Sequence, residues 1–191
     1  MDSDILIYIQ EFIRNDILTP IMVFITHTGD YGVLFIVLAA LLIIIPKTRA
    51  LGCIVGASLA LEFIITNLLL KNLVGRTRPY EVIEELELLI GEQPDPSFPS
   101  GHSGIAFAFA GAMLFASFFC VIELAKSSKY RVVTYLTLLY ALILSVSRMY
   151  VGVHYPTDVF AGILLGLLTG LISSLFFKRF PRLLPGGSSG N

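Results

Sequence analysis

The chain has 191 residues, of which 55% are hydrophobic and 14% are charged, against about 25% charged in an ordinary soluble domain. Its 13 basic and 14 acidic residues leave a formal net charge of −1, so no basic surface field attracts nucleic acid and no such partner is expected. This composition excludes a disordered, collagen-like or nucleic-acid-binding chain and indicates an integral membrane protein.

Residues 1–29 contain no uncharged stretch long enough to span a bilayer. From Ile5 to Ile13, apolar residues recur at helical spacing opposite acidic and basic ones, which predicts a helix lying in the headgroup plane. A second helix is expected to begin at Thr19-Pro20, as N-cap and first helical residue. His27 has no partner in any motif and is interpreted as an interfacial polar residue. We therefore expect residues 1–29 to form an interfacial amphipathic segment.

Five apolar segments of membrane-spanning character follow, each with at most one charged residue. They cover residues 31–46, 50–70, 103–122, 132–147 and 159–177. The predicted fold is all-α, a polytopic transmembrane helix bundle that forms one membrane-embedded domain over residues 30–180.

Two smaller features accompany these spans. The cysteines Cys53 and Cys120 both lie in apolar runs, which favours small buried side chains over a disulfide, a metal ligand or a nucleophile. The tail at 181–191 has linker composition and is predicted to be disordered.

The basic residues predict how the bundle is oriented, because short cytoplasmic loops are enriched in Lys and Arg. Five spans divide the loops into two sets, and one set carries eight basic residues beside a single acid, Glu123. The eight are Lys47, Arg49, Lys126, Lys129, Arg131, Lys178, Arg179 and Arg182. We expect this set to be cytoplasmic and the N-terminus, with the acidic loop Glu81–Asp95, to lie outside.

Three polar clusters lie at span ends, where charged residues are costly and need a reason. The first, KNLVGRTRPY, contains Lys71 and Arg78, which a continuing helix would place on one face before Pro79 stops it. The second, FPSGHSG, puts Ser100, Gly101 and His102 at a helix N-terminus, where free N–H groups favour a phosphate. The third, SRMYVGVHYPTD, contains Ser147, Arg148, His154 and Asp158.

The predicted topology puts all three clusters on the outer side, although they come from different parts of the chain. Together they supply three cations, a helix N-terminus, two imidazoles and one carboxylate. These parts suit phosphoryl transfer without a metal or other cofactor, because the side-chain cations stabilise the charge on the transferred group.

The three motifs, in this order on a polytopic chain, resemble the signature of the type 2 phosphatidic acid phosphatases. The resemblance covers Lys71 to Pro79, Pro99 to His102 and Ser147 to Asp158, without a departure at any signature position. It implies an integral-membrane hydrolase that acts on a lipid phosphate through a phosphohistidine intermediate. Soluble vanadium haloperoxidases share the signature but lack membrane spans.

The resemblance also implies roles for the motif residues. His154 is expected to be the nucleophile, Asp158 to hold its tautomer, and His102 to protonate the leaving oxygen and later activate water. The phosphate-binding residues implied are Lys71, Arg78, Ser100, Gly101 and Arg148. Read only structurally, Asp158 and Ser100 are helix-capping residues and the three cations snorkel to headgroups.

Residues outside the signature are interpreted more conservatively. Arg76 is expected to snorkel, and Glu62, in the second span, to have a packing role too deep for the phosphate site. Small residues at Gly162, Gly166 and Gly170 favour close helix packing first and homodimerisation second. The loop Glu81–Asp95 is equally compatible with a lid and with a solvated connection.

The substrate is left open by the sequence. Undecaprenyl diphosphate, phosphatidylglycerol phosphate and phosphatidic acid each present a terminal phosphate on a long apolar tail, and the compact domain with an outward site favours the first. A transporter with interface-lining charges is a different-class alternative, but no broken midplane helix pair or internal repeat supports it. A catalytically dead member is disfavoured because the signature is intact.

Overall fold

The computed structural model describes residues 1–186, and these form helices joined by loops, the longest of which covers residues 83–100, with no strand among the described residues. The α-helices are α1 (Asp2–Tyr8), α2 (Leu18–Thr28), α3 (Val33–Ile44), α4 (Arg49–Phe63), α5 (Lys71–Val74), α6 (Pro79–Val82), α7 (Gly101–Phe118), α8 (Ser128–Tyr150) and α9 (Pro156–Arg179). Single turns of 3-10 helix are η2 (Asp30–Gly32), η4 (Glu123–Lys126) and η5 (Pro181–Leu183), and π-helical turns are η1 (Ile9–Ile13) and η3 (Ile64–Leu70). The expected all-α bundle is confirmed.

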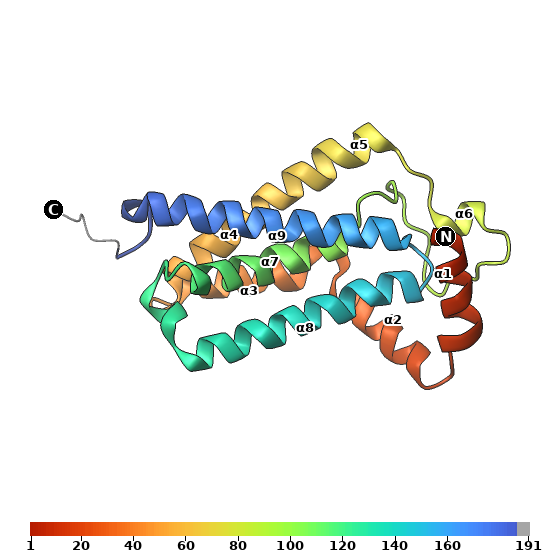
Figure 1. Cartoon of the computed structure of the whole chain (residues 1–191), viewed down its shortest axis with the longest axis horizontal. Coiled ribbons are helices and arrows are strands. Elements are labelled where there is room, and N and C mark those ends of the chain that lie inside the picture. The colour runs from red at the N-terminus through yellow and green to blue at the C-terminus, as the bar shows by residue number, and fades with distance from the viewer. Residues whose placement is uncertain (187–191) are drawn as a thin grey trace.

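The long helices lie side by side in a bundle, with α1, α2 and α6 gathered at one end and the C-terminus at the other (Figure 1). Four helical segments are long and apolar enough to cross a membrane, and a fifth span exists if α2 and the segment Asp30–Ile44, bent by 43° between them, are counted together. The protein is therefore a multi-pass membrane protein.

Helix α7 lies at the centre of this bundle and packs against α9, α8 and α4. Its small residues allow close approach, as do the three glycines predicted to form a stripe on α9. A Cβ added at Gly162, Gly166 or Gly170 would lie 2.4–2.5 Å from the backbone of α7 or of its N-cap Ser100. The stripe is buried against α7, as the packing interpretation expects, and it leaves no surface there for a second copy of the chain.

The N-terminal segment differs from expectation in two ways. Helix α2 begins at Leu18, not at Thr19-Pro20, because the Asn15 side chain accepts hydrogen bonds from the backbone N–H groups of Ile17 and Leu18. In addition, α2 packs against α8 and continues through η2 into α3, so its position is set by helix packing rather than by the headgroup plane alone. The expected first span, 31–46, is only the second half of this bent pair.

Three further expectations were wrong in detail. Cys53 is half-buried, but Cys120 is exposed, since it occupies a left-handed turn with φ of 50° just after α7 ends. The helix that carries Lys71 ends at Gly75, whose φ is 58°, and Pro79 instead begins α6. The tail is ordered at its start, because residues 181–183 form η5 and Leu184 is buried. Residues 187–191 lie outside the described part.

Candidate active site

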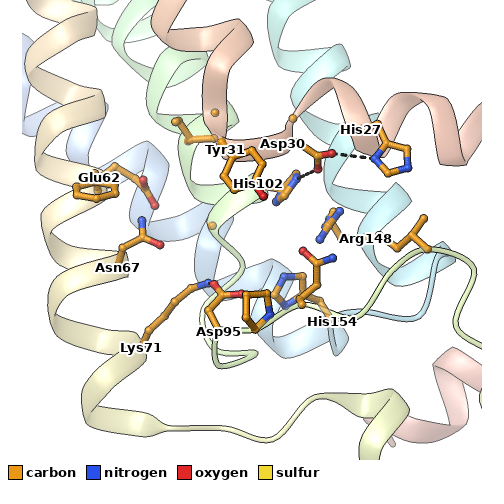
Figure 2. A pocket seen from close by; sticks show the side chains of 18 of the residues that line it. His27, Asp30, Tyr31, Glu62, Asn67, Lys71, Asp95, His102, Arg148 and His154 are labelled. Carbon is orange, nitrogen blue, oxygen red and sulfur yellow. Dashed lines mark hydrogen bonds and ion pairs between the residues drawn. The ribbon is translucent and has the colours of Figure 1, made fainter.

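The three polar clusters meet in one cavity of about 360 Å³ at the end of the bundle that also holds α1, α2 and α6. Six of the predicted site residues line it: Lys71, Arg78, Gly101, His102, Arg148 and His154. Figure 2 shows side chains from several helices and loops converging on this space. Because no two of the three motifs adjoin in the sequence, their convergence is a property of the fold.

His154 lies in the short loop between α8 and α9, and its side chain is 2% exposed. Its Nδ1 lies 3.6 Å from Asp158 Oδ2 and 3.4 Å from Ser97 Oγ. Its Nε2 lies 3.5 Å from Arg78 Nη1, on the cavity side. Burial, together with the charges of Arg78 and Arg148, lowers the pKa of His154 to about 3, and the nearby Asp158 carboxylate opposes this change. The imidazole is therefore neutral near pH 7.

Asp158 does not line the cavity but lies directly behind His154, fully buried at the start of α9. Its Oδ2 accepts hydrogen bonds from the Ser97 hydroxyl at 2.5 Å and from the Tyr155 backbone N–H at 2.9 Å. The same carboxylate therefore caps α9 and faces the imidazole.

Arg76 completes the surroundings of Asp158, contrary to the expectation that it snorkels. Its Nη1 donates to Asp158 Oδ1 at 2.6 Å, and its Nη2 lies 3.1 Å from Asp2 Oδ2. The guanidinium also lies over the Tyr155 ring, 4.0 Å from the centroid. A fork of donors can serve two carboxylates at once, which an exposed, lipid-facing side chain could not do.

In the second motif, Ser100 caps α7, whereas Gly101 and His102 line the cavity. Ser100 is fully buried and does not line the cavity; its hydroxyl oxygen accepts from the Ser103 N–H as the N-cap of α7. The Ser100 N–H donates to the Asp158 carbonyl oxygen at 3.0 Å, which ties α7 to α9. Gly101 lines the cavity, and a Cβ there would be 3.9 Å from Lys71 Nζ. Of the two residues expected to bind phosphate, Gly101 therefore lines the cavity, whereas Ser100 lies behind it as the N-cap of α7.

The three cations of the signature are buried around the cavity. Arg148 Nη1 donates to Thr26 Oγ1 at 2.6 Å, and its Nε has no partner within residues 1–186. Lys71 and Arg78 both contact the carboxylate of Asp95, the latter at 2.8 Å. The loop before α7 brings these two cations together at Asp95. They do not lie on one face of a continuing helix, which was the expectation.

Asp95 is the last residue of the acidic loop, and its contact with the two cations was not expected. Burial disfavours its ionisation, but the hydrogen bond from Lys71 and the charges of Lys71 and Arg78 outweigh burial and hold the Asp95 pKa below its ordinary value. With Ile90, Gln93 and Pro94 it lines the cavity. This end of the loop is thus part of the cavity wall rather than a solvated connection.

Glu62, Asp30 and His27 also line the cavity, and sequence reasoning placed none of them in the site. Glu62 is 1% exposed and packs so closely on α7 that a Cβ at Gly104 would lie 2.0 Å from its Oε1. The expectation that Glu62 is too deep for the phosphate site is wrong, because the cavity extends from Lys71 to it. For Asp30, the sequence did contain a signal: it is an acidic residue directly before an expected membrane span, where charge is costly.

Comparison with known proteins agrees with the motifs. The PAP2 superfamily matches residues 51–182. The chain belongs to the PAP2 superfamily. It is 35% identical over 152 residues to an undecaprenyl-diphosphatase of Sulfolobus acidocaldarius, covering 78% of this chain and 66% of that protein. It is 31% identical over 171 residues to the undecaprenyl-diphosphatase BcrC of Bacillus subtilis, covering 90% of this chain and 79% of that one.

Solved PAP2 structures share the fold as well. A transmembrane PAP2-type phosphatidylglycerolphosphate phosphatase from Bacillus subtilis superposes with a TM-score of 0.75 at 29% identity, covering 95% of this chain and 87% of the other. The LpxE protein of Aquifex aeolicus superposes with a TM-score of 0.72 at 26% identity, covering 89% and 92%. The predicted family and the expectation of a membrane lipid phosphatase, a hydrolase, are confirmed.

Proposed function

We propose that this PAP2 protein removes the terminal phosphate of a lipid phosphate or diphosphate at the outer membrane face, through a phosphohistidine formed on His154. The observation that carries the proposal is the cavity itself, where a neutral imidazole backed by a carboxylate faces buried cations. Transferred phosphoryl groups need positioning and charge stabilisation more than covalent chemistry from the protein.

In the first step, His154 Nε2 attacks phosphorus in line and the bond to the leaving oxygen breaks. The Asp158 carboxylate, 3.6 Å from Nδ1, favours the tautomer protonated on Nδ1, which leaves the Nε2 lone pair free, and it stabilises positive charge on the ring. Arg78, Arg148 and Lys71 hold the phosphoryl oxygens, and Gly101 allows the phosphate to approach the start of α7. His102 protonates the leaving oxygen.

In the second step, water attacks the phosphohistidine while His102 takes its proton, and the P–N bond breaks to release phosphate. His154 returns to its neutral form in this step. The two imidazoles thus have different tasks, and the cation set carries the charge stabilisation that Mg²⁺ provides in many phosphoryl-transfer sites.

Undecaprenyl diphosphate is the substrate we favour. The relatives from Sulfolobus acidocaldarius and Bacillus subtilis that carry undecaprenyl-diphosphatase names support it. Phosphatidylglycerol phosphate and phosphatidic acid are the alternatives, and the Bacillus subtilis phosphatase structure favours the former. A transporter is disfavoured because the charged groups surround one cavity at one end of the bundle.

The test is phosphate release by the purified protein in detergent, with initial rates compared on these three lipids at equal surface concentration. The His154→Ala variant serves as the matched blank. We expect turnover of at least one lipid, with undecaprenyl diphosphate giving the largest kcat/KM. Absence of turnover on all three would contradict the proposal, and a clear preference for phosphatidylglycerol phosphate would reassign the substrate.

A further inference from the structure

His102 has a carboxylate partner of its own, supplied by a distant part of the chain. Its Nε2 lies 3.2 Å from Asp30 Oδ1, while Asp30 Oδ2 lies 2.8 Å from His27 Nδ1. Figure 2 shows the Asp30 carboxylate between the two imidazoles. Asp30 lies outside residues 51–182, the part that the PAP2 superfamily matches.

The backbone at the junction of α2 and α3 holds Asp30 in this place. Tyr31 and Gly32 have φ values of 53° and 67°, conformations that L residues rarely adopt. On one side of Asp30, a Cβ added at Gly29 would be 2.6 Å from His102 Cδ2. On the other side, a Cβ at Gly32 would be 2.2 Å from Ile105 Cδ1. The turn therefore packs directly on the first residues of α7.

We propose that Asp30 is the positioning residue for His102, fixing its tautomer and stabilising its imidazolium form. The inference rests on the acid–base role proposed above for His102. An ionised carboxylate only accepts hydrogen bonds, so Nε2 carries the proton shared with Asp30. The other ring nitrogen, Nδ1, makes no hydrogen bond to residues 1–186 and remains for the leaving oxygen.

The proton balance follows from this arrangement. In the first step the Nδ1 proton passes to the leaving oxygen while the P–N bond to His154 forms. In the second step Nδ1 accepts a proton from the attacking water while that bond breaks. Nε2–H stays on Asp30 throughout, as the corresponding proton does in other carboxylate–imidazole pairs.

The charges around the cavity explain why His102 needs a carboxylate. Lys71 and Arg148 line the same cavity, and their positive charges repel a positively charged imidazole. The charged or titratable groups lining it are His27, Asp30, Tyr31, Glu62, Lys71, Arg78, Asp95, His102, Arg148 and His154. Of the described carboxylates only Asp30 forms an ion pair with His102, whereas Asp95 already faces Lys71 and Arg78.

The test compares Asp30→Asn with Asp16→Asn, an exposed aspartate of the same N-terminal segment. Phosphoenzyme formation is followed by rapid mixing and alkaline quench on two substrates: a lipid phosphate, whose leaving group needs an acid, and an activated aryl phosphate, whose leaving group does not. Asp30→Asn should slow phosphoenzyme formation from the lipid about 10- to 100-fold, within the range of general-acid effects. With the aryl phosphate the phosphoenzyme should form at nearly the wild-type rate and then accumulate.

Two further variants separate positioning from a general structural role. In a His102→Ala background, Asp30→Asn should cause no further change in either rate, because its effect passes through the missing imidazole. Asp30→Glu, which keeps the carboxylate, should recover part of the rate on the lipid. A partly unfolded sample lowers both rates equally, so the ratio between substrates within one variant is insensitive to it.

Equal losses on both substrates, or an additional loss in the His102→Ala background, would overturn the assignment of Asp30. If wild-type protein turns over lipid and Asp30→Asn behaves like Asp16→Asn, the positioning role of Asp30 is refuted but the proposed function is not. If the wild type forms no phosphoenzyme from either substrate, the proposed function fails with it.

Discussion

Replacing Arg76 with alanine should disable the carboxylate behind the nucleophile without touching the signature residues. Arg76 Nη1 donates to Asp158 Oδ1 at 2.6 Å, and the Asp158 side chain is fully buried. The variant leaves this oxygen without its charged partner, so the carboxylate becomes less stable in its ionised form. An Asp158 that is less readily ionised is a weaker acceptor for His154 Nδ1–H.

The size of the effect follows from what remains around Asp158. Removing one partner of a buried ion pair costs about 3–5 kcal/mol. Here Asp158 keeps the Ser97 hydroxyl at 2.5 Å and the Tyr155 N–H at 2.9 Å. Moreover, the Arg76 side chain is 30% exposed, so water can reach the vacated position. We therefore expect a loss of about 1–2 kcal/mol in the free energy of unfolding and about a tenfold loss in kcat.

Thermal unfolding in detergent and initial rates on a lipid phosphate measure the two losses. A loss of 1–2 kcal/mol corresponds to a decrease in Tm of about 2–8 °C for a chain of this size. Arg131→Ala, an exposed arginine at the other end of the bundle, is the control, and Arg76→Lys should fall between because it keeps the charge but not the fork. A Tm and kcat for Arg76→Ala equal to those of Arg131→Ala would refute the reasoning.

Four further outcomes are expected. His154→Ala should form no phosphoenzyme from any substrate. His102→Ala should lose far more rate on an alkyl phosphate than on an activated aryl phosphate, and equal losses on the two substrates would contradict its assignment as the general acid. In a background without the two native cysteines, a cysteine at Gly91 should react with an impermeant reagent in intact cells and one at Ser128 should not, and the opposite pattern would invert the topology. Activity should survive EDTA and be inhibited by vanadate, and a strict requirement for an added divalent ion would contradict the metal-free mechanism. Asp95→Asn should lower the inhibition constant of vanadate about tenfold, because the cavity cations lose a competing carboxylate; an unchanged constant would mean that Asp95 does not compete with the ligand.

Much of the fold was predictable because its determinants are local. Apolar runs marked four of the spans to within a few residues of α4 with η3, α7, α8 and α9. The first span was assigned less well, since α2 and α3 form one bent pair whose break depends on the left-handed turn at residues 31 and 32. Hydropathy averages over such a turn and therefore cannot locate it.

The site was predictable where spacing within one segment decides the contact. His154 and Asp158 are four residues apart, and the start of α9 places them together. Lys71 and Arg78 were assigned to the site correctly for a wrong geometric reason, because Gly75 ends the helix between them. Both residues nevertheless line the cavity, because the loop before α7 brings them together at Asp95.

Contacts between distant segments were not predictable from the residues alone. Arg76 has the same chain neighbours whether it snorkels or pairs with Asp158, 82 residues away. Asp95 likewise cannot be distinguished from the other acids of its loop in the sequence, and only the fold places it next to Lys71. Only the arrangement of the helices distinguishes these alternatives, and a single sequence does not contain it.

The two imidazole–carboxylate pairs illustrate this difference within one cavity. In the first pair, Asp158 lies four residues after His154 and accepts from the backbone N–H of Tyr155 between them, so a short stretch encodes both partners. In the second pair, 72 residues separate Asp30 from His102, and close packing of Gly29 on the ring brings them together. A change anywhere in the α2–α3 turn should therefore affect His102 while leaving His154 in place. The α2–α3 turn, outside the matched family region, is thus expected to act on acid–base catalysis through Asp30, whereas Asp2 of α1 reaches the carboxylate behind His154 through Arg76.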